Sequence, residues 1–360
     1  MSHATFTPPG AWRPAEDHWG SFARLCARRL PEGSLAVVDR TVARLHPGLL
    51  PTLRARKPRG LVLLTGGERA KSFPALEQVL AAGLTLPRSG TLIAIGGGTI
   101  GDVSTVAAHL LKRGVRLIQV PTTLLAAVDS SLGGKGAVDL TVRGRVVKNP
   151  AGVFHYAEEG WLCPELFSTL SDTQRREGAL EAWKMVASLD AELFRRYVRR
   201  EPSLERLIQD ARRLKDSVCA RDPYEQQGLR RVLNFGHTFG HVLESLSNFR
   251  LSHGDAVGLG MLCALDVGRH LGTTPEDVAT RVEEALHQGP GVLGRERTAA
   301  LLRRASLKDV TTLLSADKKA GHAGELRMVL LTAVGATEVR DVSANTWRAL
   351  WPAWTRGERP

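Results

Sequence analysis

Three histidines stand close together in the second half of the chain and could bind a metal ion. They are His237, His241 and His253, three of the eleven histidines in 360 residues. His237 and His241 are four residues apart, so in a helix both face the same side. Imidazole nitrogens are common ligands of Zn²⁺ and similar ions, and a catalytic site adds a further protein ligand and an open position. We expect a metal or catalytic site here, with Glu177 and Glu181 on the preceding predicted helix as candidate ligands.

A glycine-rich turn in the first half could bind a dinucleotide. The segment Gly96–Asp102 (GGGTIGD) follows a predicted strand and opens a predicted helix. Glycines at such a turn let backbone N–H groups approach a pyrophosphate at the positive end of the helix. The pattern differs from the usual GxGxxG, and such turns also arise from packing alone. Asp39 ends an early strand, where it can accept from ribose hydroxyls, and Thr122 and Thr123 offer hydroxyl donors at the same sheet edge.

A polar segment lies between these two regions. Val128–Lys135 contains Asp129, two serines, two glycines and Lys135. It is either a surface turn or a loop that carries Asp129 and Lys135 into a cleft. Lys148 and Asn149 form a second pair of a base and an amide nearby in the sequence.

These side chains need elements that position them, and the first 150 residues alternate predicted strands with predicted helices. We expect strands at 34–38, 60–64, 91–95 and 116–120, and helices at 72–82 and 101–112. Alternation of this kind predicts an α/β fold with a doubly wound parallel sheet.

The second half is predicted to be mainly helical. We expect helices at 172–189, 205–220, 240–246, 255–271 and 275–287, and one strand at 326–331. We place the boundary within 150–165 and divide the chain into an α/β domain, 1–160, and a helical domain, 161–360. Trp347, Trp351 and Trp354 share one face of a helix. We interpret this face as docking on the protein body rather than as a surface for stacking a ligand.

The composition is that of an ordinary globular protein, with 43% hydrophobic and 24% charged residues. No stretch approaches the roughly 18 apolar residues of a membrane span, and Met1–Arg13 lacks the apolar core of a secretion signal. The four cysteines lie far apart without a CxxC pair, which we interpret as reduced thiols in a cytoplasmic protein.

The net charge of +12 fits two kinds of partner, a nucleic acid or an anionic substrate. The basic residues occur as dispersed pairs and form no long block. This pattern favours the anionic substrate, so neither a nucleic acid nor a membrane is an expected partner.

Motifs in order along the chain resemble the dehydroquinate synthase family, which belongs to the sugar phosphate cyclases. The resemblance covers about Glu68 to Gly335. It is carried by GGExxK (66–71), GGGTIGD (96–102), KRGVRLIQVPTTLLAAVDSSLGGK (112–135), KN (148–149), GLRxxLNFGHTFGH (228–241), SHGDAVGLGM (252–261) and DKK (317–319). The resemblance implies an N-terminal dinucleotide-binding α/β domain, a C-terminal helical metal-binding domain and a homodimer.

The resemblance also implies a reaction. The family converts 3-deoxy-arabino-heptulosonate 7-phosphate, a phosphorylated keto-acid sugar, to 3-dehydroquinate and phosphate. NAD⁺ oxidises one substrate hydroxyl and is restored within the turnover, while Zn²⁺ or Co²⁺ polarises an oxygen. A phosphate and a carboxylate on one substrate call for many cations, which agrees with the net charge.

Roles for individual residues follow from the same resemblance. The implied metal ligands are Glu181, His237 and His253, and His241 handles a proton near the substrate phosphate. The implied substrate-site residues are Asp129, Lys135, Asn149, Lys184, Lys215, Arg230, Asn234 and Lys318, with Arg113 reaching the phosphate across the dimer interface. The implied NAD-site residues are Asp39, Glu68, Lys71, Gly97, Gly98, Gly101, Asp102, Thr122, Thr123 and Lys148.

Departures from the family pattern leave some of these positions open. About four extra residues precede Lys148. One extra residue near 222–228 makes either Lys215 or Asp216 the position that faces the substrate. The DKK motif supplies either Lys318 or Lys319.

Other functions remain as alternatives. Arg230 suits bidentate binding of a carboxylate, which favours dehydroquinate or its amino analogue as product over a neutral cyclitol. A cyclase of secondary metabolism, which makes aminodehydroquinate or a C7 cyclitol, is the first alternative. A metal-dependent NAD alcohol dehydrogenase would change the NADH concentration during turnover, whereas a cyclase would not. A basic protein without enzymatic activity would bind nucleic acid with strong salt dependence.

Overall fold

The structure of the chain, a computed structural model, describes residues 14–142, 145–316 and 325–360. The chain folds into two units. The first runs to Ser171 and includes Cys219–Tyr224, and the second comprises Asp172–Val218 and Glu225–Pro360. The expected boundary after residue 160 would cut strand β8 (Glu159–Leu162), which belongs to the sheet of the first unit.

Six parallel strands form the sheet of the first unit, in the order β1–β8–β5–β4–β2–β3. After β3 the chain crosses to the other side of β2 to form β4, so β2 and β4 flank the point where the winding reverses. Ligands of such sheets bind beyond the carboxyl ends of the strands at this point. Besides β8, the strands are β1 (Glu16–Trp19), β2 (Leu35–Asp39), β3 (Gly60–Leu64), β4 (Thr91–Gly96) and β5 (Arg116–Pro121).

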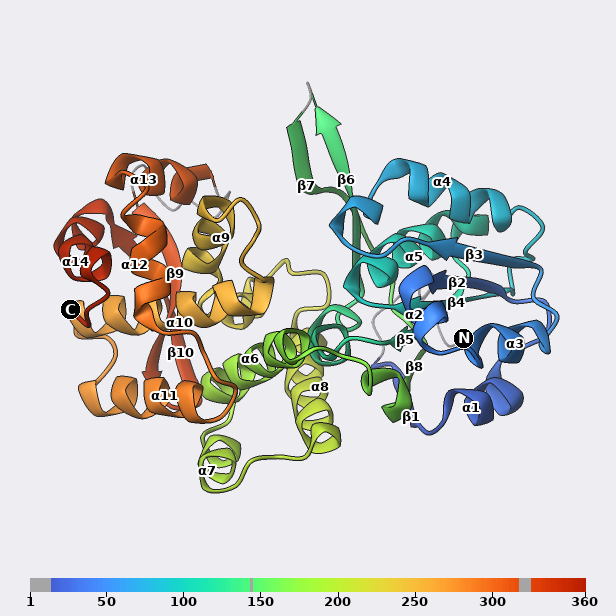
Figure 1. Ribbon diagram of the computed structural model, residues 1–360, viewed down its shortest axis with the longest axis horizontal. Coiled ribbons are helices and arrows are strands. Elements are labelled where there is room, and N and C mark those ends of the chain that lie inside the picture. The colour runs from blue at the N-terminus through green and yellow to red at the C-terminus, as the bar shows by residue number, and fades with distance from the viewer. Residues whose placement is uncertain (1–13, 143–144, 317–324) are drawn as a thin grey trace, which may run out of the picture. The chain divides into compact units, whose positions relative to one another are not determined.

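Alternating residues of β2 pack into two hydrophobic cores, one on each face of the sheet. Leu35 and Val37 pack with residues of α4 and α5, whereas Ala36 and Val38 pack with residues of α1 and α3. Helices therefore cover both faces (Figure 1), which confirms the predicted doubly wound fold. The elements outside the sheet are α1 (Phe22–Arg29), α2 (Arg40–Leu45), α3 (Leu49–Arg54), η1 (Glu68–Ala70), α4 (Phe73–Ala82), α5 (Gly98–Leu110), η2 (Leu111–Arg113), η3 (Ala126–Ser130), β6 (Lys135–Val142), β7 (Arg145–Phe154) and η4 (Pro164–Phe167).

The hairpin of β6 and β7 was not among the predicted elements. These two strands pair in an antiparallel ladder with a register shift between Val138 and Leu140. The polar segment before them is a π-helical turn, η3, followed by the start of β6 at Lys135. Val128 is buried in this turn, so the segment is not a free surface loop.

The second unit is mainly helical, as predicted, with one antiparallel pair of strands. No helix among the described residues is both long enough and apolar enough to cross a bilayer. The elements are α6 (Asp172–Leu189), α7 (Ala191–Arg199), α8 (Leu204–Arg221), η5 (Leu229–Asn234), α9 (His237–Leu246), α10 (His253–His270), α11 (Glu276–Gln288), α12 (Arg295–Leu302), α13 (Leu307–Ala316), β9 (Glu325–Ala333), β10 (Ala336–Ser343) and α14 (Ala344–Arg356).

Helix α10 forms the centre of the second unit, because every residue from Gly254 to Gly268 is buried. Its backbone closely approaches α9. A Cβ atom on Gly260 would lie 2.0 Å from the carbonyl oxygen of Gly236, so only glycine fits there. Trp347 and Trp354 of α14 are each only 3% exposed, as expected for a helix that docks on the body of the protein.

Candidate functional site

One carboxylate and two imidazoles come together in the second unit. Glu181 lies on α6, His237 begins α9 and His253 begins α10. Each offers one ligand atom, and these atoms all lie within 4.8 Å of one another. Glu181 Oε1 is 3.8 Å from His237 Nε2 and 3.7 Å from His253 Nε2. We refer to these three residues as the Glu-His-His cluster.

The Glu-His-His cluster fits a divalent metal ion. Glu181 is fully buried, and its Oε1 atom has no hydrogen-bond partner among the described residues. A buried carboxylate oxygen without a partner is costly. A cation bound among the three ligand atoms would remove that cost, and two histidines with one glutamate are a donor set known for catalytic zinc.

Neighbouring oxygens orient both imidazoles so that Nε2 of each faces Glu181. His253 Nδ1 lies 3.3 Å from Glu244 Oε1, and His237 Nδ1 lies 3.5 Å from the carbonyl oxygen of Phe235. Partners of this kind fix the ring orientation of metal-binding histidines. Burial opposes protonation of His253, but the hydrogen bond to Glu244 and the charge of Glu181 outweigh burial and raise its pKa.

Glu244 was not among the residues singled out from the sequence. It lies seven residues after His237 and three after His241, on the same face of α9. Helical spacing could therefore have identified it. The alternative carboxylate, Glu177, is not part of the cluster but lies against Ser252 and Gly254, where burial raises its pKa.

Two further predicted residues lie beside the cluster. Lys184 Nζ contacts Glu181 Oε2 one turn along α6, and the lysine is 1% exposed. The His241 ring lies 5.6 Å from the ring of His237 and 6.3 Å from that of His253, measured between centroids. His241 is thus a neighbour of the cluster without being one of the three grouped ligands.

The other predicted residues of this unit lie on η5 and α8. Arg230, at 4% exposed, and Asn234 lie on η5, which contacts α6. Lys215 is buried on α8, whereas Asp216 is partly exposed. Their assignment to the substrate stays a prediction. Lys318 and Lys319 lie outside the described residues.

The glycine-rich turn in the first unit joins β4 to α5. Gly97 precedes the helix, and Gly98 is its first residue, three residues before the expected start. A Cβ atom on Gly98 would lie 2.9 Å from Ser130 Oγ, and one on Gly97 would lie 3.1 Å from Thr123 Cγ2. Glycine therefore keeps the backbone N–H groups at the start of α5 accessible to an anion. Gly101 packs in turn against Gln119.

Asp39 ends β2 beside this turn, because Val38 pairs with Ile95 in the sheet. Its Oδ1 atom accepts from Thr41 N at 2.7 Å and caps α2. Its Oδ2 atom lies against Gly66, where a Cβ atom would come within 2.0 Å. The carboxylate is therefore held by its neighbours, with one oxygen engaged in the cap.

Thr122 and Thr123 follow β5 at the same end of the sheet. Thr122 Oγ1 is buried without a hydrogen-bond partner among the described residues, and Thr123 Oγ1 accepts from Ala126 N at 3.2 Å. The Thr122 hydroxyl can therefore still form a hydrogen bond with a ligand.

Four of the predicted NAD-site residues form two ion pairs. Lys71 Nζ contacts Asp102 Oδ2, and Lys148 Nζ lies 3.3 Å from Glu68 Oε1. Burial raises the pKa of Asp102 to about 6, although the charge of Lys71 opposes this rise.

The hairpin adds a residue that was not predicted, Asp139. Its backbone N–H donates to the carbonyl oxygen of Lys71 at 2.8 Å, and its carboxylate accepts from Asn149 N at 2.8 Å. Asp139 thus ties Asn149, which has a positive φ of 57°, to the Lys71 segment. No periodic signal in the sequence marked Asp139.

The remaining predicted residues of the first unit are spread over three elements. Asp129 lies in η3, Lys135 is exposed at the start of β6, and Arg113 is exposed at the end of η2 with a positive φ of 63°. A positive φ is uncommon for residues other than glycine.

The fold is similar to those of two solved synthases. A 2-epi-5-epi-valiolone synthase from Streptomyces hygroscopicus subsp. jinggangensis 5008 gives a TM-score of 0.80 at 24% identity, covering 96% of this chain and 98% of that one. A 2-deoxy-scyllo-inosose synthase gives 0.78 at 23% identity, covering 93% and 95%. These similarities show that the chain shares the fold of these two synthases.

The sequence comparisons identify the family. The N-terminal domain of 3-dehydroquinate synthase matches residues 61–177, and its C-terminal domain matches residues 178–320. The 3-dehydroquinate synthase of Methylacidiphilum infernorum (isolate V4) is 35% identical over 322 residues, which cover 88% of this chain and 86% of that protein. The chain belongs to the 3-dehydroquinate synthase family.

Proposed function

We propose that the protein is a metal- and NAD-dependent carbon–oxygen lyase that converts 3-deoxy-arabino-heptulosonate 7-phosphate to 3-dehydroquinate and phosphate. The observation that carries the chemistry is the Glu-His-His cluster, whose ligand atoms lie within 4.8 Å of one another. The choice of substrate rests on the 35% identity to a 3-dehydroquinate synthase over 88% of the chain.

The proposal assigns a cofactor to each unit. NAD⁺ binds at the turn before α5, and Zn²⁺ or Co²⁺ binds to Glu181, His237 and His253. The similar solved synthases are described as complexes with NAD⁺ and with Co²⁺ or Zn²⁺. When bound, NAD⁺ takes up and returns a hydride and the divalent ion acts as a Lewis acid toward a substrate oxygen.

In this proposal the side chains of the second unit bind and orient the substrate. Arg230 binds the carboxylate with two parallel hydrogen bonds, a geometry that suits a buried guanidinium. Lys184 offsets the charge of Glu181 and donates to a substrate oxygen. His241, next to the cluster, holds the proton that travels with the phosphate leaving group. Asn234 and Lys215 donate further hydrogen bonds to the substrate.

The proposal includes a homodimer in which Arg113 of one protomer reaches the substrate phosphate of its partner. Arg113 is exposed and has a backbone conformation that costs free energy for a non-glycine residue. Such conformations concentrate at functional positions. Asp129, Lys135 and Asn149 complete the substrate contacts from the first unit.

A single assay tests the proposal. Purified protein, NAD⁺ and Co²⁺ or Zn²⁺ are mixed with the heptulosonate phosphate, and phosphate, 3-dehydroquinate and NADH absorbance are followed together. Equal amounts of phosphate and product without net NADH are expected. Turnover only of the amino analogue or of a neutral sugar phosphate would instead identify a cyclase of secondary metabolism. Net NADH formation would identify an alcohol dehydrogenase.

A further inference from the structure

The two histidines of the Glu-His-His cluster come from different helices, so their separation depends on how α9 and α10 pack. His237 is the first residue of α9, and His253 is the first residue of α10. At Gly240 the backbone of α9 lies directly against the backbone of α10, because a Cβ atom on Gly240 would lie 3.2 Å from the Ala256 carbonyl oxygen. This contact sets how near the helices come, and the Met261 side chain of α10 lies against Gly236 at the start of α9.

Trp354 of α14 contacts both helices. Its ring packs edge-on against Phe239 of α9, with 4.9 Å between ring centroids and 76° between ring planes. Its Nε1–H donates to Asp266 Oδ2 of α10 at 2.8 Å. Phe239 lies between His237 and His241 in the sequence, so the tryptophan holds the helix turn that carries both histidines.

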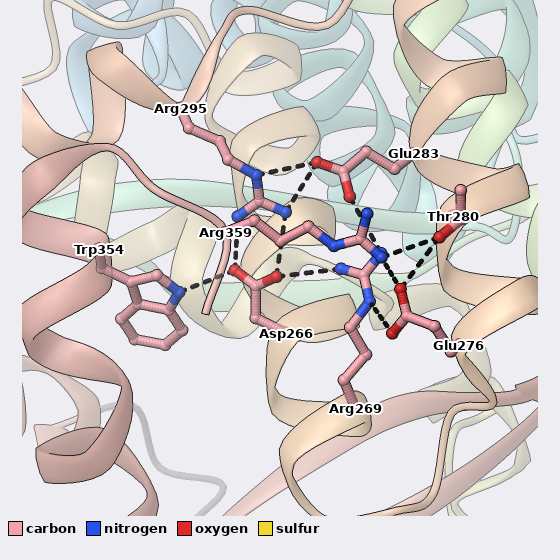
Figure 2. A network of polar contacts seen from close by, with 8 residues as sticks. All are labelled: Asp266, Arg269, Glu276, Thr280, Glu283, Arg295, Trp354 and Arg359. Carbon is pink, nitrogen blue, oxygen red and sulfur yellow. Dashed lines mark hydrogen bonds and ion pairs between the residues drawn. The ribbon is translucent and has the colours of Figure 1, made fainter.

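Asp266, which accepts the indole hydrogen bond of Trp354, is held in place by its neighbours. Asp266 is fully buried and accepts two bonds from Arg295 of α12, at 2.5 and 3.0 Å, and one from Arg269 at 3.2 Å. Figure 2 shows Trp354 completing this network from the side opposite Arg269 and Glu283. An acceptor fixed by two guanidinium groups gives the indole a defined position on α10.

Phe239, which packs against the ring of Trp354, is also held in place by its neighbours. Phe239 is 1% exposed, and a second tryptophan of α14, Trp347, packs against it at 5.1 Å and 69°. Aromatic pairs in edge-to-face geometry prefer a narrow range of positions. A shift of α9 relative to α10 would therefore break either the ring contact or the indole hydrogen bond.

We propose that Trp354 is a positioning residue for the metal centre, which sets the spacing of His237 and His253 by joining α9 to α10. The inference rests on the proposed metal site at the Glu-His-His cluster. The contacts of Trp354 described above are to Phe239 and Asp266, so in this proposal it acts through the positions of two helices. Metal affinity depends on ligand spacing within a few tenths of an ångström, so small helix shifts lower it.

The test compares metal binding with folding in three variants. Trp354→Ala removes both contacts, Trp354→Phe keeps the aromatic ring and removes the hydrogen bond, and Trp351→Phe is the matched control on the same helix. Each protein is stripped with a chelator. Co²⁺ affinity is then measured by competition with a chelating dye, the visible Co²⁺ spectrum is recorded, and thermal unfolding of the metal-free form is followed.

We expect Trp354→Ala to weaken Co²⁺ binding by about tenfold and to alter the Co²⁺ spectrum, and Trp354→Phe to weaken binding by about threefold. Trp351→Phe should bind Co²⁺ like the wild type. If Trp354→Ala does not fold, the comparison of the two phenylalanine variants decides. Unchanged Co²⁺ affinity in Trp354→Phe, with a lower unfolding temperature, would show a purely structural role and overturn the inference. A wild-type protein that binds no Co²⁺ would overturn the proposed metal site, and the inference with it.

Discussion

Each unit of the molecule contains an ion pair between a buried lysine and a carboxylate, and the two pairs differ in the burial and the contacts of the carboxylate. In the first unit Lys71 contacts Asp102, whose side chain is 18% exposed. In the second unit Lys184 contacts Glu181, whose side chain is 0% exposed and whose second oxygen has no hydrogen-bond partner among the described residues. That free oxygen faces two imidazole nitrogens.

The difference shows that a pair of a lysine and a carboxylate can serve two purposes, depending on how the carboxylate is surrounded. Asp102 can take up a proton near its raised pKa of about 6, so its carboxyl group can lose its charge without a ligand. Glu181 Oε1 faces two imidazole nitrogens and has no hydrogen-bond partner among the described residues, so this oxygen is suited to bind a cation. The first carboxyl group is partly exposed, whereas the second is fully buried and has one oxygen that a cation could satisfy.

The largest expected effect is that of a substitution in the Glu-His-His cluster, compared with the same substitution at His241 beside it. His237→Ala removes one of the three proposed ligands and should abolish stoichiometric metal binding and lower kcat by more than ~10³-fold, because a Lewis acid supplies several kcal/mol of stabilisation. His241→Ala, one turn further along α9, should keep the metal but slow turnover. Metal content by elemental analysis and steady-state rates measure both. Loss of metal in His241→Ala with retention in His237→Ala would invert the ligand assignment.

The next prediction compares the two lysines directly. Lys184→Met leaves Glu181 as an unpaired buried charge and should lower the free energy of unfolding of the metal-free protein by roughly 3–5 kcal/mol. Lys71→Met should cost only about 1–2 kcal/mol, because Asp102 can become protonated. Urea unfolding of the metal-free proteins measures both values.

Lys148→Met serves as the control for this comparison. Its partner Glu68 is 50% exposed, so its loss should change the free energy of unfolding by less than about 1 kcal/mol. Equal losses in Lys184→Met and Lys71→Met would remove the distinction between the two pairs.

The raised pKa of Asp102 gives a pH dependence with a defined sign. The folded protein holds the Asp102 proton up to a pH of about 6, whereas the unfolded chain releases it near the ordinary aspartate pKa of 3.8. The folded state binds more protons between these values, so the free energy of unfolding falls as the pH rises through this window, by up to roughly 3 kcal/mol. Asp102→Asn lacks this step.

The measurement is urea unfolding of the wild type and Asp102→Asn at several pH values between about 4 and 7. The wild type should lose stability relative to the variant as the pH rises. A difference that stays constant, or one that grows in the opposite direction, would show that Lys71 dominates the titration of Asp102.

The smallest expected effect is that of a substitution of Glu244, whose carboxylate lies beside His253 Nδ1. Glu244→Gln keeps a hydrogen-bond acceptor near Nδ1 but removes its charge, and should weaken metal binding by about tenfold. Chelator competition measures the change. Glu284→Gln, an exposed position on α11, controls for the altered net charge and should have no effect. Equal affinities in both variants would exclude Glu244 from supporting the metal site.

Much of the first unit's sheet could be predicted from the sequence, because its central strands are continuous apolar runs. The strand expected at 60–64 matches β3, and those expected at 91–95 and 116–120 match β4 and β5 to within one residue. The hairpin of β6 and β7 escaped prediction because its outer residues are not apolar in a regular alternation. Val146 is 63% exposed, and Lys148 and Asn149 interrupt the strand.

The candidate site, like the fold, could be predicted from the sequence only in part. Histidine spacing on one helix indicated α9 but left Glu177 and Glu181 open as ligands. The family resemblance implied Glu181, and the structure groups Glu181 with the two histidines, whereas Glu177 lies one turn earlier on α6. The choice between Lys215 and Asp216 was open because the sequence did not fix the place of the one extra residue near 222–228, and an offset of one residue rotates a helix position by about 100°. The structure buries Lys215 to 7% exposure, a fact about tertiary packing that no local pattern contains.

The return of residues 219–224 to the first unit has a consequence for the order in which the chain folds. Tyr156 donates its hydroxyl to the carbonyl oxygen of Pro223, and the ring of Tyr224 packs against Phe154 and Tyr156. A ribosome that has synthesised only the first 171 residues has not yet made these partners. The first unit therefore cannot be completed as a nascent chain until helix α8, most of which belongs to the second unit, has emerged from the ribosome.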